Sequence, residues 1–416
     1  MGPPNVVTDL GGGIFEIDPV TNSATPLANQ PAELRRATKL IADPRSNTGW
    51  YVGTRGTVVT SPGPVYIYHV SAAAGRVLTA RKLNTDDMRS DVEIKAMVLV
   101  DDKVIFGSDT RVGYVPAAGG ASVTLFTFAR ANLNPAIASD GRYLYTNIWD
   151  NNGWSTGGGS IWRHDLQNLG TATSIFSVDN FPTNIYGLTL DASGRLWSVS
   201  RGTFAAPVLR AFDVFTGTKI NEVVLPWTAL TSAMSVAVDG FNDNVVVTGQ
   251  GFASLTDKNF YAAAVQNWKV GTPINSSAHE LTGSASRRVP GLVRRGFECK
   301  SPSNPELAAL ASGTPEVGNN KYSVDLRGPS GRVAVFLLGA GAAFPPVKLL
   351  PTACELGVNP ILVFGAVIPP SQRLQIPLPI PANAVNAFVD TQWAVFEASA
   401  NALGIVTTQV GAICVG

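Results

Sequence analysis

The chain repeats one pattern: an alternating apolar segment, a turn that contains Asp, and a second alternating apolar segment. Copies are "KLIADPRSNTGWYVGT", "AIASDGRYLYTN", "GLTLDASGRLWSVSRG" and "SVAVDGFNDNVVVTG". Alternation with a period of two is typical of half-buried β-strands, and Asp, Asn and Gly are favoured in tight turns. Each copy therefore predicts an antiparallel hairpin, and their recurrence predicts a repeat architecture.

The full repeat holds four predicted strands, and its clearest copy runs "YGLTLD", "RLWSVSR", "PVLRAFDVFTGTK" and "INEVVLP". A four-stranded sheet has two apolar faces, and stacking such sheets radially buries both. The pattern therefore predicts a β-propeller. Complete units are expected at 37–83, 94–128, 134–178, 185–226 and 233–283.

A sixth blade is predicted from both ends of the repeat region. Residues 5–30 supply only its second, third and fourth strands, so the innermost strand is expected from the chain after the fifth blade, within 287–295. Such a closure joins the two ends of the ring and leaves few free strand edges. Six blades is the expected number, and seven follows if two units have been merged.

The repeat stops near residue 297, where Pro and Gly become more frequent. Short apolar runs separated by turn signals predict an antiparallel β-sandwich in this part of the chain. The expected organisation is an all-β protein with a propeller at 1–295 and a sandwich at 296–416.

A set of short motifs runs through the second domain. They are Gly296 and Cys299, then Pro315, Gly318, Asn319, Tyr322, Val324 and Leu326, then Leu337–Leu338–Gly339, Cys354, Leu356 and Val358, then Pro377–Leu378–Pro379–Ile380–Pro381 and Gln392–Trp393. In these motifs the segment resembles the C-terminal domains of secreted proteins from planctomycetes and some other environmental bacteria. Two residues rather than one separate Gly296 from Cys299, and Cys414 departs from the pattern.

The resemblance implies secretion or surface display and a Cys299–Cys354 disulfide, but no activity. On a chain-entropy estimate such a bond would stabilise the domain by roughly 3 to 4 kcal/mol. The first domain resembles streptogramin lyase, NHL-repeat and gluconolactonase-like propellers in architecture alone, and no catalytic residue carries over.

Composition excludes several functions. The formal net charge is +1, 15% of residues are charged, and no run of Lys or Arg exceeds two, so nucleic-acid binding is not expected. No apolar stretch is long enough to span a bilayer. Abundant Thr, Asn, Ser and Gly and the resemblance of the second domain favour an extracellular or cell-surface protein. The start "MGPPNVVTDL" has neither the basic region nor the apolar core of a signal peptide, so we expect that the leader has been removed.

Catalytic and metal-binding signals are weak. His69 and His164 fall in predicted third strands, which favours packed strand residues, and His279 has no evident partner. The three cysteines are too far apart in sequence for a zinc motif. The acidic segment 84–93 is more typical of a solvated loop than of a Ca²⁺ site, so no cofactor is expected, with Ca²⁺ as the alternative.

The strongest functional signal lies in the loops between the second and third strands of the blades. In a propeller these loops emerge on one face, where they would form a rim. The candidate ligand-binding residues there are Arg55, Asp109, Arg111, Trp149, Asp150, Trp154, Arg201 and Gln250. Aromatic rings beside amides, carboxylates and guanidinium groups suit carbohydrate binding, but Arg–Asp pairs that close the ring are an alternative.

The sequence favours a secreted or surface-displayed binding or structural protein without catalytic activity, which binds glycans or other copies of itself. The alternative is a propeller enzyme, a polysaccharide lyase or hydrolase that uses Asp and Arg on the rim. An acid with a raised pKa beside Arg55 or Arg201 in a deep central pocket would favour the enzyme, and a shallow or plugged axial channel would count against it. A further hypothesis gives the main role to the sandwich, in which sheet edges or an apolar patch around "AVFLLGAGAAFPPV" would pack against another subunit.

Overall fold

The structure is a computed structural model of the 416-residue chain, divided into two compact units. The first comprises Met1–Asp191 and Arg195–Arg288, and the second Ala192–Gly194 and Val289–Gly416. The residues described are all except 1–4, 10–12, 19–22, 44–48, 57–62, 73–77, 128–134, 148–158, 167, 179–182, 203–205, 226–230, 240–243, 252–259, 267–268, 271–273, 277–280, 286–291, 296–298, 300–306, 314, 316, 341, 350–353, 385–386 and 416.

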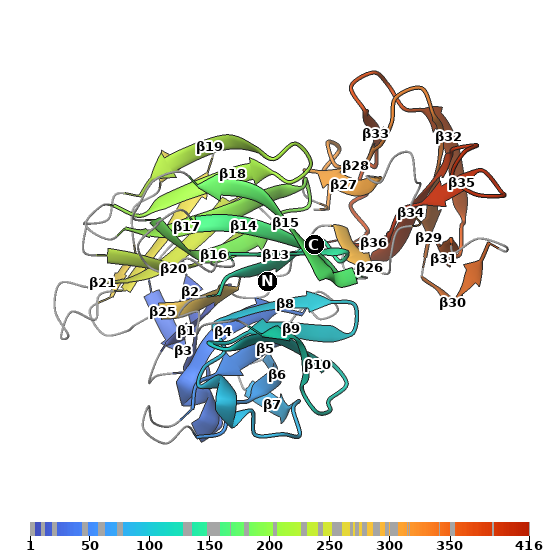
Figure 1. The fold of residues 1–416 in the computed structure, drawn as a ribbon. Helices are drawn as coiled ribbons and strands as arrows, with labels where there is room; N and C mark the ends of the chain where they lie inside the picture. Colours follow the sequence, from blue (N-terminus) through green and yellow to red (C-terminus); the bar gives the residue numbers. More distant parts are fainter. Residues whose placement is uncertain are drawn as a thin grey trace. The chain divides into compact units, whose positions relative to one another are not determined.

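The first unit consists of antiparallel sheets, each built mainly from strands that follow one another in the chain (Figure 1). The first three sheets are β4 (Ala37–Ala42), β5 (Gly49–Thr54), β6 (Ile67–Ala72) and β7 (Leu78–Lys82); β8 (Ala96–Val100), β9 (Lys103–Gly107), β10 (Arg111–Pro116) and β11 (Val123–Thr127); and β12 (Ile137–Ser139), β13 (Tyr143–Thr146), β14 (Gly159–Asp165) and β15 (Asn168–Val178).

Three more sheets complete the unit. They are β16 (Thr183–Leu190), β17 (Arg195–Gly202), β18 (Val208–Asp213) and β19 (Thr218–Val224); β20 (Thr231–Asp239), β21 (Asn244–Gly251), β22 (Phe260–Gln266), β23 (Lys269–Val270) and β24 (Ile274–Ser276); and β25 (Leu281–Ala285), β1 (Asn5–Asp9), β2 (Gly13–Asp18) and β3 (Ser23–Pro26). Two 3₁₀ turns, η1 (Ala32–Arg36) and η2 (Arg89–Asp91), precede β4 and β8.

Contacts between the first strands of these sheets close a ring. In order, β4 contacts β8, β8 contacts β12, β12 contacts β16, β16 contacts β20, β20 contacts β25, and β25 contacts β4. Neighbouring sheets thereby bury each other's apolar faces, as the repeat predicts. This is the architecture of a β-propeller with six sheets in the described part of the chain.

As expected, a strand from after the fifth blade completes the N-terminal sheet and closes the ring, but it is not the segment that was expected. The N-terminal strand β1 pairs with β25, with Val7 opposite Ser284. The expected closing segment, 287–295, is wrong, because its strand β26 (Leu292–Arg295) pairs with β36 (Val410–Cys414) of the second unit. Both segments are short and apolar enough for a strand, so periodicity alone does not separate them.

The repeated Asp has a structural role at the turn between the first and second strands. Asp140 accepts hydrogen bonds from the backbone N–H groups of Arg142 (2.9 Å) and Tyr143 (2.7 Å), which fixes the turn. Its second carboxylate oxygen accepts from the hydroxyl of Tyr145 at 2.9 Å. The same aspartate–aromatic bond recurs in two other blades, as Tyr51 to Asp43 (3.4 Å) and Trp197 to Asp191 (2.9 Å).

Adjacent blades approach closely at glycines of the second strands. A Cβ atom on Gly53 would lie 2.5 Å from Cγ2 of Ile94, and one on Gly107 would lie 2.9 Å from Cδ1 of Ile137. No larger residue fits these positions without moving the next blade. The hydroxyl of Thr38 also donates to the carbonyl of Ile94 at 2.6 Å. These contacts fix the segment that enters β8, which carries the candidate site.

The second unit is a β-sandwich (Figure 1). Side chains from two sheets, among them Val324, Phe336 and Trp393, fill one buried core between them. One sheet has the order β26–β36–β34–β29–β32, with β34 (Phe388–Phe396), β29 (Val333–Gly339) and β32 (Leu362–Val367); β35 (Ile405–Thr407) also pairs with β34. The other contains β27 (Ala308–Ser312), β28 (Ser323–Arg327) and β33 (Arg373–Pro377), and β30 (Ala342–Lys348) forms a separate pair with β31 (Glu355–Val358).

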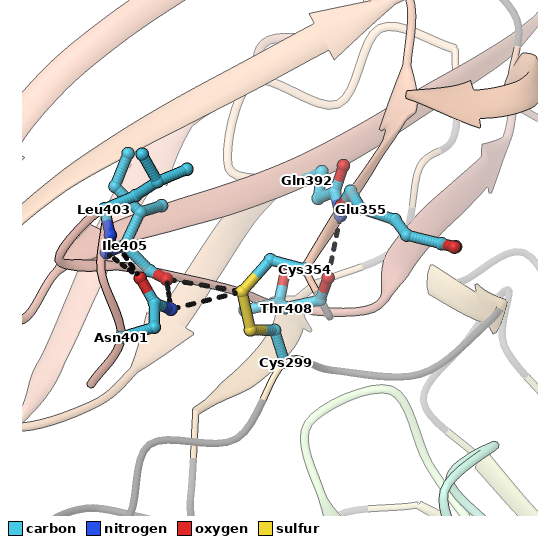
Figure 2. The surroundings of a disulfide bond; sticks show 8 residues. All are labelled: Cys299, Cys354, Glu355, Gln392, Asn401, Leu403, Ile405 and Thr408. Atoms are coloured by element: carbon cyan, nitrogen blue, oxygen red, sulfur yellow. Dashed lines mark hydrogen bonds between the residues drawn. A yellow bond between two sulfur atoms is a disulfide. The ribbon is translucent and has the colours of Figure 1, made fainter. Parts of the chain in front are cut away.

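Cys299 and Cys354 are joined by a disulfide, with Cα atoms 4.9 Å apart (Figure 2). Beside it, the side-chain amide of Gln392 donates to the carbonyls of Glu355 and Thr408, both at 2.9 Å. The disulfide and this amide together tie the start of β31 to the larger sheet. Cys414 is the last residue of β36, and its side chain lies outside the described residues.

Candidate functional site

Five charged residues from two adjacent blades gather at one end of their sheets: Lys39, Arg55, Glu93, Lys95 and Asp109. We refer to them as the inter-blade cluster. Strand register explains the location, because the start of each first strand lies opposite the end of the second: Ala37 faces Thr54, and Ala96 faces Gly107. Residues that begin β4 or β8 therefore lie beside residues that follow β5 or β9.

Direct contacts connect the cluster. The ammonium of Lys95 forms an ion pair with the carboxylate of Asp109, and these side chains are only 15% and 14% exposed. Arg55 forms an antiparallel backbone bridge with Glu93, which joins the loop after β5 to the segment before β8. Lys39 and Glu93 are half-buried, whereas Arg55 is exposed. Charge of both signs is thus held at the boundary between two blades.

The cluster shifts two pKa values in opposite directions. Burial lowers the pKa of Lys39 to about 8; Glu93 opposes this shift and Lys95 reinforces it. Burial raises the pKa of Glu93, an effect that Lys95 and Arg55 oppose and Asp109 reinforces. Burial thus weakens the charged form of both groups, a carboxyl and an amine in the same cluster.

A buried ion pair holds the segment that carries Glu93. Asp91 is fully buried and accepts hydrogen bonds from Nε (2.9 Å) and Nη2 (2.6 Å) of Arg111. The hydroxyl of Ser108 donates to the same carboxylate at 2.7 Å. Charge-assisted bonds of this bidentate kind fix geometry strongly. Glu93 lies two residues beyond this anchor.

The backbone leading to Glu93 is strained. Met88 has φ of 42° and Val92 has φ of 49°. Positive φ is unusual for any residue with a side chain, and for a β-branched residue such as Val it is an outlier that persists only where the surroundings enforce it. Here the N–H of Gly56 donates to the carbonyl of Val92 at 2.8 Å, and the N–H of Ile94 donates to that of Thr54 at 3.1 Å.

The structure brings together some of the rim residues predicted from the sequence. Arg55 and Asp109 belong to the inter-blade cluster. Arg111 lies at the start of β10, and besides Asp91 its guanidinium donates to the hydroxyls of Ser122 (3.0 Å) and Thr124 (2.7 Å), so it positions other groups.

The remaining rim residues are described only in part. The backbone of Arg201 lies opposite Asn184, and that of Gln250 opposite Ser232, so each is the penultimate residue of a second strand and not part of the loop expected from the sequence. The side chains of Arg201 and Gln250 lie outside the described residues, and so do Trp149, Asp150 and Trp154.

Sequence reasoning missed Lys39 and Lys95 and saw Glu93 only as part of an acidic loop. A signal for them exists in the repeat itself. "VGTR" and "FGSD" place Arg55 and Asp109 at equivalent positions, two residues after the glycine at the end of the second strand. Lys39 lies opposite Gly53 in the ladder of β4 and β5, and Lys95 directly precedes β8, so each lysine lies near the residue that follows its neighbouring strand.

The histidines and the acidic loop have structural partners. His69 pairs with Asp43 at 3.0 Å. His164 is buried, contacts the hydroxyl of Thr146 at 3.1 Å, and has a pKa lowered to about 4 by burial. Asp86 accepts from Ser122, and Asp87 from Tyr66 and Arg89. Within the part of the chain that the structure describes, no three His, Cys, Asp or Glu residues are placed to hold a metal ion; His279 lies outside that part.

No protein-family model and no curated protein matches the chain. Among solved structures it is similar to a candidate TolB from Agrobacterium tumefaciens, with 10% identity and a TM-score of 0.45 over 68% of this chain and 92% of that one. A GH74 enzyme of Niastella koreensis gives 12% identity and 0.44 over 95% and 65%. The Pan2 WD40 domain of Neurospora crassa gives 11% and 0.39 over 92% and 99%. These TM-scores are too low to support any conclusion, so the fold is assigned from the strand pairing of this chain alone.

None of the described helical segments has the length and apolar character needed to cross a membrane.

Proposed function

We propose that the protein is a secreted or surface-displayed binding protein, and that the inter-blade cluster is part of a glycan-binding surface at one end of the propeller. The observation that supports this most directly is the convergence of Lys39, Arg55, Glu93, Lys95 and Asp109 from two blades. Charged groups held in place by neighbouring strands form hydrogen bonds without a large ordering cost when a ligand arrives.

The cluster suits a sugar with acidic groups. Carboxylates accept hydrogen bonds from sugar hydroxyls, and the cations of Lys and Arg donate to hydroxyl or carboxylate oxygens. Three cations face two carboxylates, one of which has a raised pKa, so positive charge is in excess. The tryptophans predicted for the rim, Trp149 and Trp154, would supply stacking faces. The disulfide supports an oxidising location outside the cytosol.

Binding of the full chain to immobilised neutral and acidic glycans tests the proposal. Arg55→Ala should weaken binding about 10-fold or more, the loss expected for one charge-assisted hydrogen bond. Lys103→Ala is the matched control, because Lys103 begins the same strand that ends near Asp109 and pairs with exposed Asp102. The proposed site would be refuted if the wild-type chain bound no class of glycan, or if Arg55→Ala and Lys103→Ala weakened binding equally.

Catalysis at the same cluster is a second candidate, which the raised pKa of Glu93 beside Arg55 favours. In an elimination on an acidic polysaccharide, neutral Lys39 would remove the proton next to the sugar carboxylate. The electron pair would form the carbon–carbon double bond, and the glycosidic oxygen would leave with a proton from Glu93. Unsaturated products should then accumulate with the wild-type chain and disappear with Glu93→Gln, while that variant still binds the polysaccharide.

Association between copies of the chain is the remaining part of the proposed function. We assign it to the sandwich, since β32 leaves large apolar side chains exposed there.

A further inference from the structure

Strand β32 lies at one edge of the larger sandwich sheet (Figure 1). Its residues are apolar, and most of its large side chains are exposed. Exposed fractions are 70% for Ile361, 53% for Leu362, 59% for Val363, 51% for Phe364 and 58% for Val367. The run "ILVFGAVI" from 361 to 368 contains no charge and no proline. Large side chains are exposed on both faces of this strand, because successive residues of a strand point to opposite sides.

The free edge of β32 is regular. In the described residues it pairs with β29 alone, and the register runs without a shift from Val333 opposite Val367 to Leu338 opposite Leu362. An edge strand that is long, apolar and regular offers backbone groups to another chain. Natural edges normally carry charges, prolines or bulges that prevent such pairing, and residues 362–367 carry none of these.

The hydrogen bonds between β29 and β32 show which backbone groups of β32 point away from the sheet. The N–H of Ile368 donates to the carbonyl of Arg332 at 2.8 Å, in register with the β29–β32 ladder. In an antiparallel pair the directly bonded positions alternate, so the other even-numbered residues also bond inward to β29. The N–H and C=O groups of Val363, Gly365 and Val367 therefore point away from the sheet.

This outward edge is complementary to itself. A two-fold axis through Gly365 would set Val363 opposite Val367 of the second copy and would let these residues exchange backbone hydrogen bonds. It would also set Phe364 opposite Ala366 of the second copy, a large side chain against a small one. Since the strand is uncharged, no like charges would meet.

Gly365 lies at the centre of the outward edge. A Cβ atom there would meet only the carbonyl oxygen of Ala334, at 4.0 Å, so packing within one chain leaves room for a side chain. Its N–H and C=O groups point away from β29, and pairing about the two-fold axis would bond them to the same groups of the second copy.

We propose that β32 pairs antiparallel with β32 of a second copy and forms a two-fold symmetric dimer with one continuous sheet. This inference rests on the self-association part of the proposed function and is independent of the glycan site. Edge-to-edge pairing would bury less than the roughly 1,000 Å² that these five side chains leave exposed in two copies, because they point above and below the sheet, so the interface would be a small one. A dissociation constant in the micromolar range is expected.

Sedimentation velocity of the full chain over a concentration series tests the dimer. Gly365→Pro should raise the dissociation constant at least 10-fold, because it removes an outward-pointing N–H at the centre of the interface. The melting temperature should stay nearly unchanged, because that N–H points away from β29 within one copy. Val363→Lys should have a similar effect by placing charge on the edge. The matched control is Val224→Lys on β19, which changes a valine that is 61% exposed beside Lys219 and Glu222, and it should leave association unchanged.

Three results would overturn the inference: a monomer at all concentrations, a dimer that survives both substitutions in β32, or a monomeric chain whose β32 instead captures a different protein. A wild-type chain that stays monomeric but retains glycans would refute this inference alone. A dimer without glycan retention would refute the ligand site alone, and Arg55→Ala should leave the dimer intact.

Discussion

Asp91 in the propeller and Asp325 in the sandwich have nearly the same surroundings. Both carboxylates are fully buried, and each accepts two bonds from an arginine on a neighbouring strand: Arg111 at 2.9 and 2.6 Å, and Arg373 at 3.0 and 2.5 Å. Each also accepts from serine hydroxyls, one in the propeller and two in the sandwich. Both therefore satisfy the requirement that a buried charge be paired and hydrogen-bonded.

The two aspartates differ in the backbone that they hold. Asp325 lies in the middle of β28, whose ladders to β27 and β33 already fix the chain. Asp91 ends the 3₁₀ turn η2, between the left-handed residues Met88 and Val92. The same ion pair thus adds stability to a regular sheet in one place and holds a strained connection beside Glu93 in the other. Similar networks need not have similar functions.

Asp91→Ala is expected to have the largest effect. It leaves Arg111, which is 14% exposed, without its counter-charge, so the free energy of unfolding should fall by about 3 to 5 kcal/mol. Glycan retention should fall as well, because the segment with Glu93 loses its anchor. Denaturant unfolding and glycan binding at a temperature where the variant is folded measure the two effects. The double variant Asp91→Leu/Arg111→Leu should recover much of the stability without recovering binding.

Asp325→Ala sharpens the comparison. The loss of unfolding free energy should be smaller, about 3 kcal/mol, because Arg373 is 38% exposed and water can solvate it. Glycan retention by the folded variant should equal that of the wild type. If Asp325→Ala weakened binding as much as Asp91→Ala, the distinction between the two networks would be wrong.

His164 differs from both aspartates because it is an ionisable group that is buried in its neutral form. Its folded pKa of about 4 lies below the ordinary value of 6.5, so the unfolded chain binds the proton more readily. The stability that comes from burying neutral His164 is fully present above pH 6.5 and is lost as the pH falls toward 4. Between pH 7 and pH 5 it should cost about 2 kcal/mol of unfolding free energy. Denaturant unfolding measures the stability of wild type relative to His164→Gln, and this relative stability should fall by that amount from pH 7 to pH 5. If it were the same at both pH values, the lowered pKa of His164 would be wrong.

The sequence predicts the blades well and the site in part. Alternation and Asp turns predict the hairpins because both depend on residues close in the chain, such as Asp140 and Tyr143. The charged cluster depends partly on a contact between blades and partly on one within a single hairpin. Glu93 meets Arg55 only because the blades stack, and Lys95 meets Asp109 across the hairpin of β8 and β9. The loop 84–93 and Arg111 likewise appear in the sequence as separate features, although Asp91 and Arg111 form one ion pair.

The apolar edge was visible only indirectly. The sequence pointed to "AVFLLGAGAAFPPV", but in the structure Ala334 and Phe336 of this segment are buried in the core, and the exposed strand is its neighbour β32. Both strands are equally apolar in sequence. Which one is central and which lies at the edge depends on sheet order, and that order is set by pairings between residues far apart in the chain.

Two buried threonines give the smallest and most closely matched test. Thr38 donates to the carbonyl of Ile94 at 2.6 Å, next to Glu93, and Thr391 donates to the carbonyl of Gly411 at 3.0 Å in the sandwich. Replacing either by Val keeps the shape and removes one hydrogen bond, so each should lower the unfolding free energy by about 1 kcal/mol. Only Thr38→Val should also speed hydrogen exchange at the amide of Ile94 and weaken glycan retention, by about 2- to 5-fold. Equal effects of both variants on retention would mean that the ligand responds to overall stability rather than to the position of Glu93.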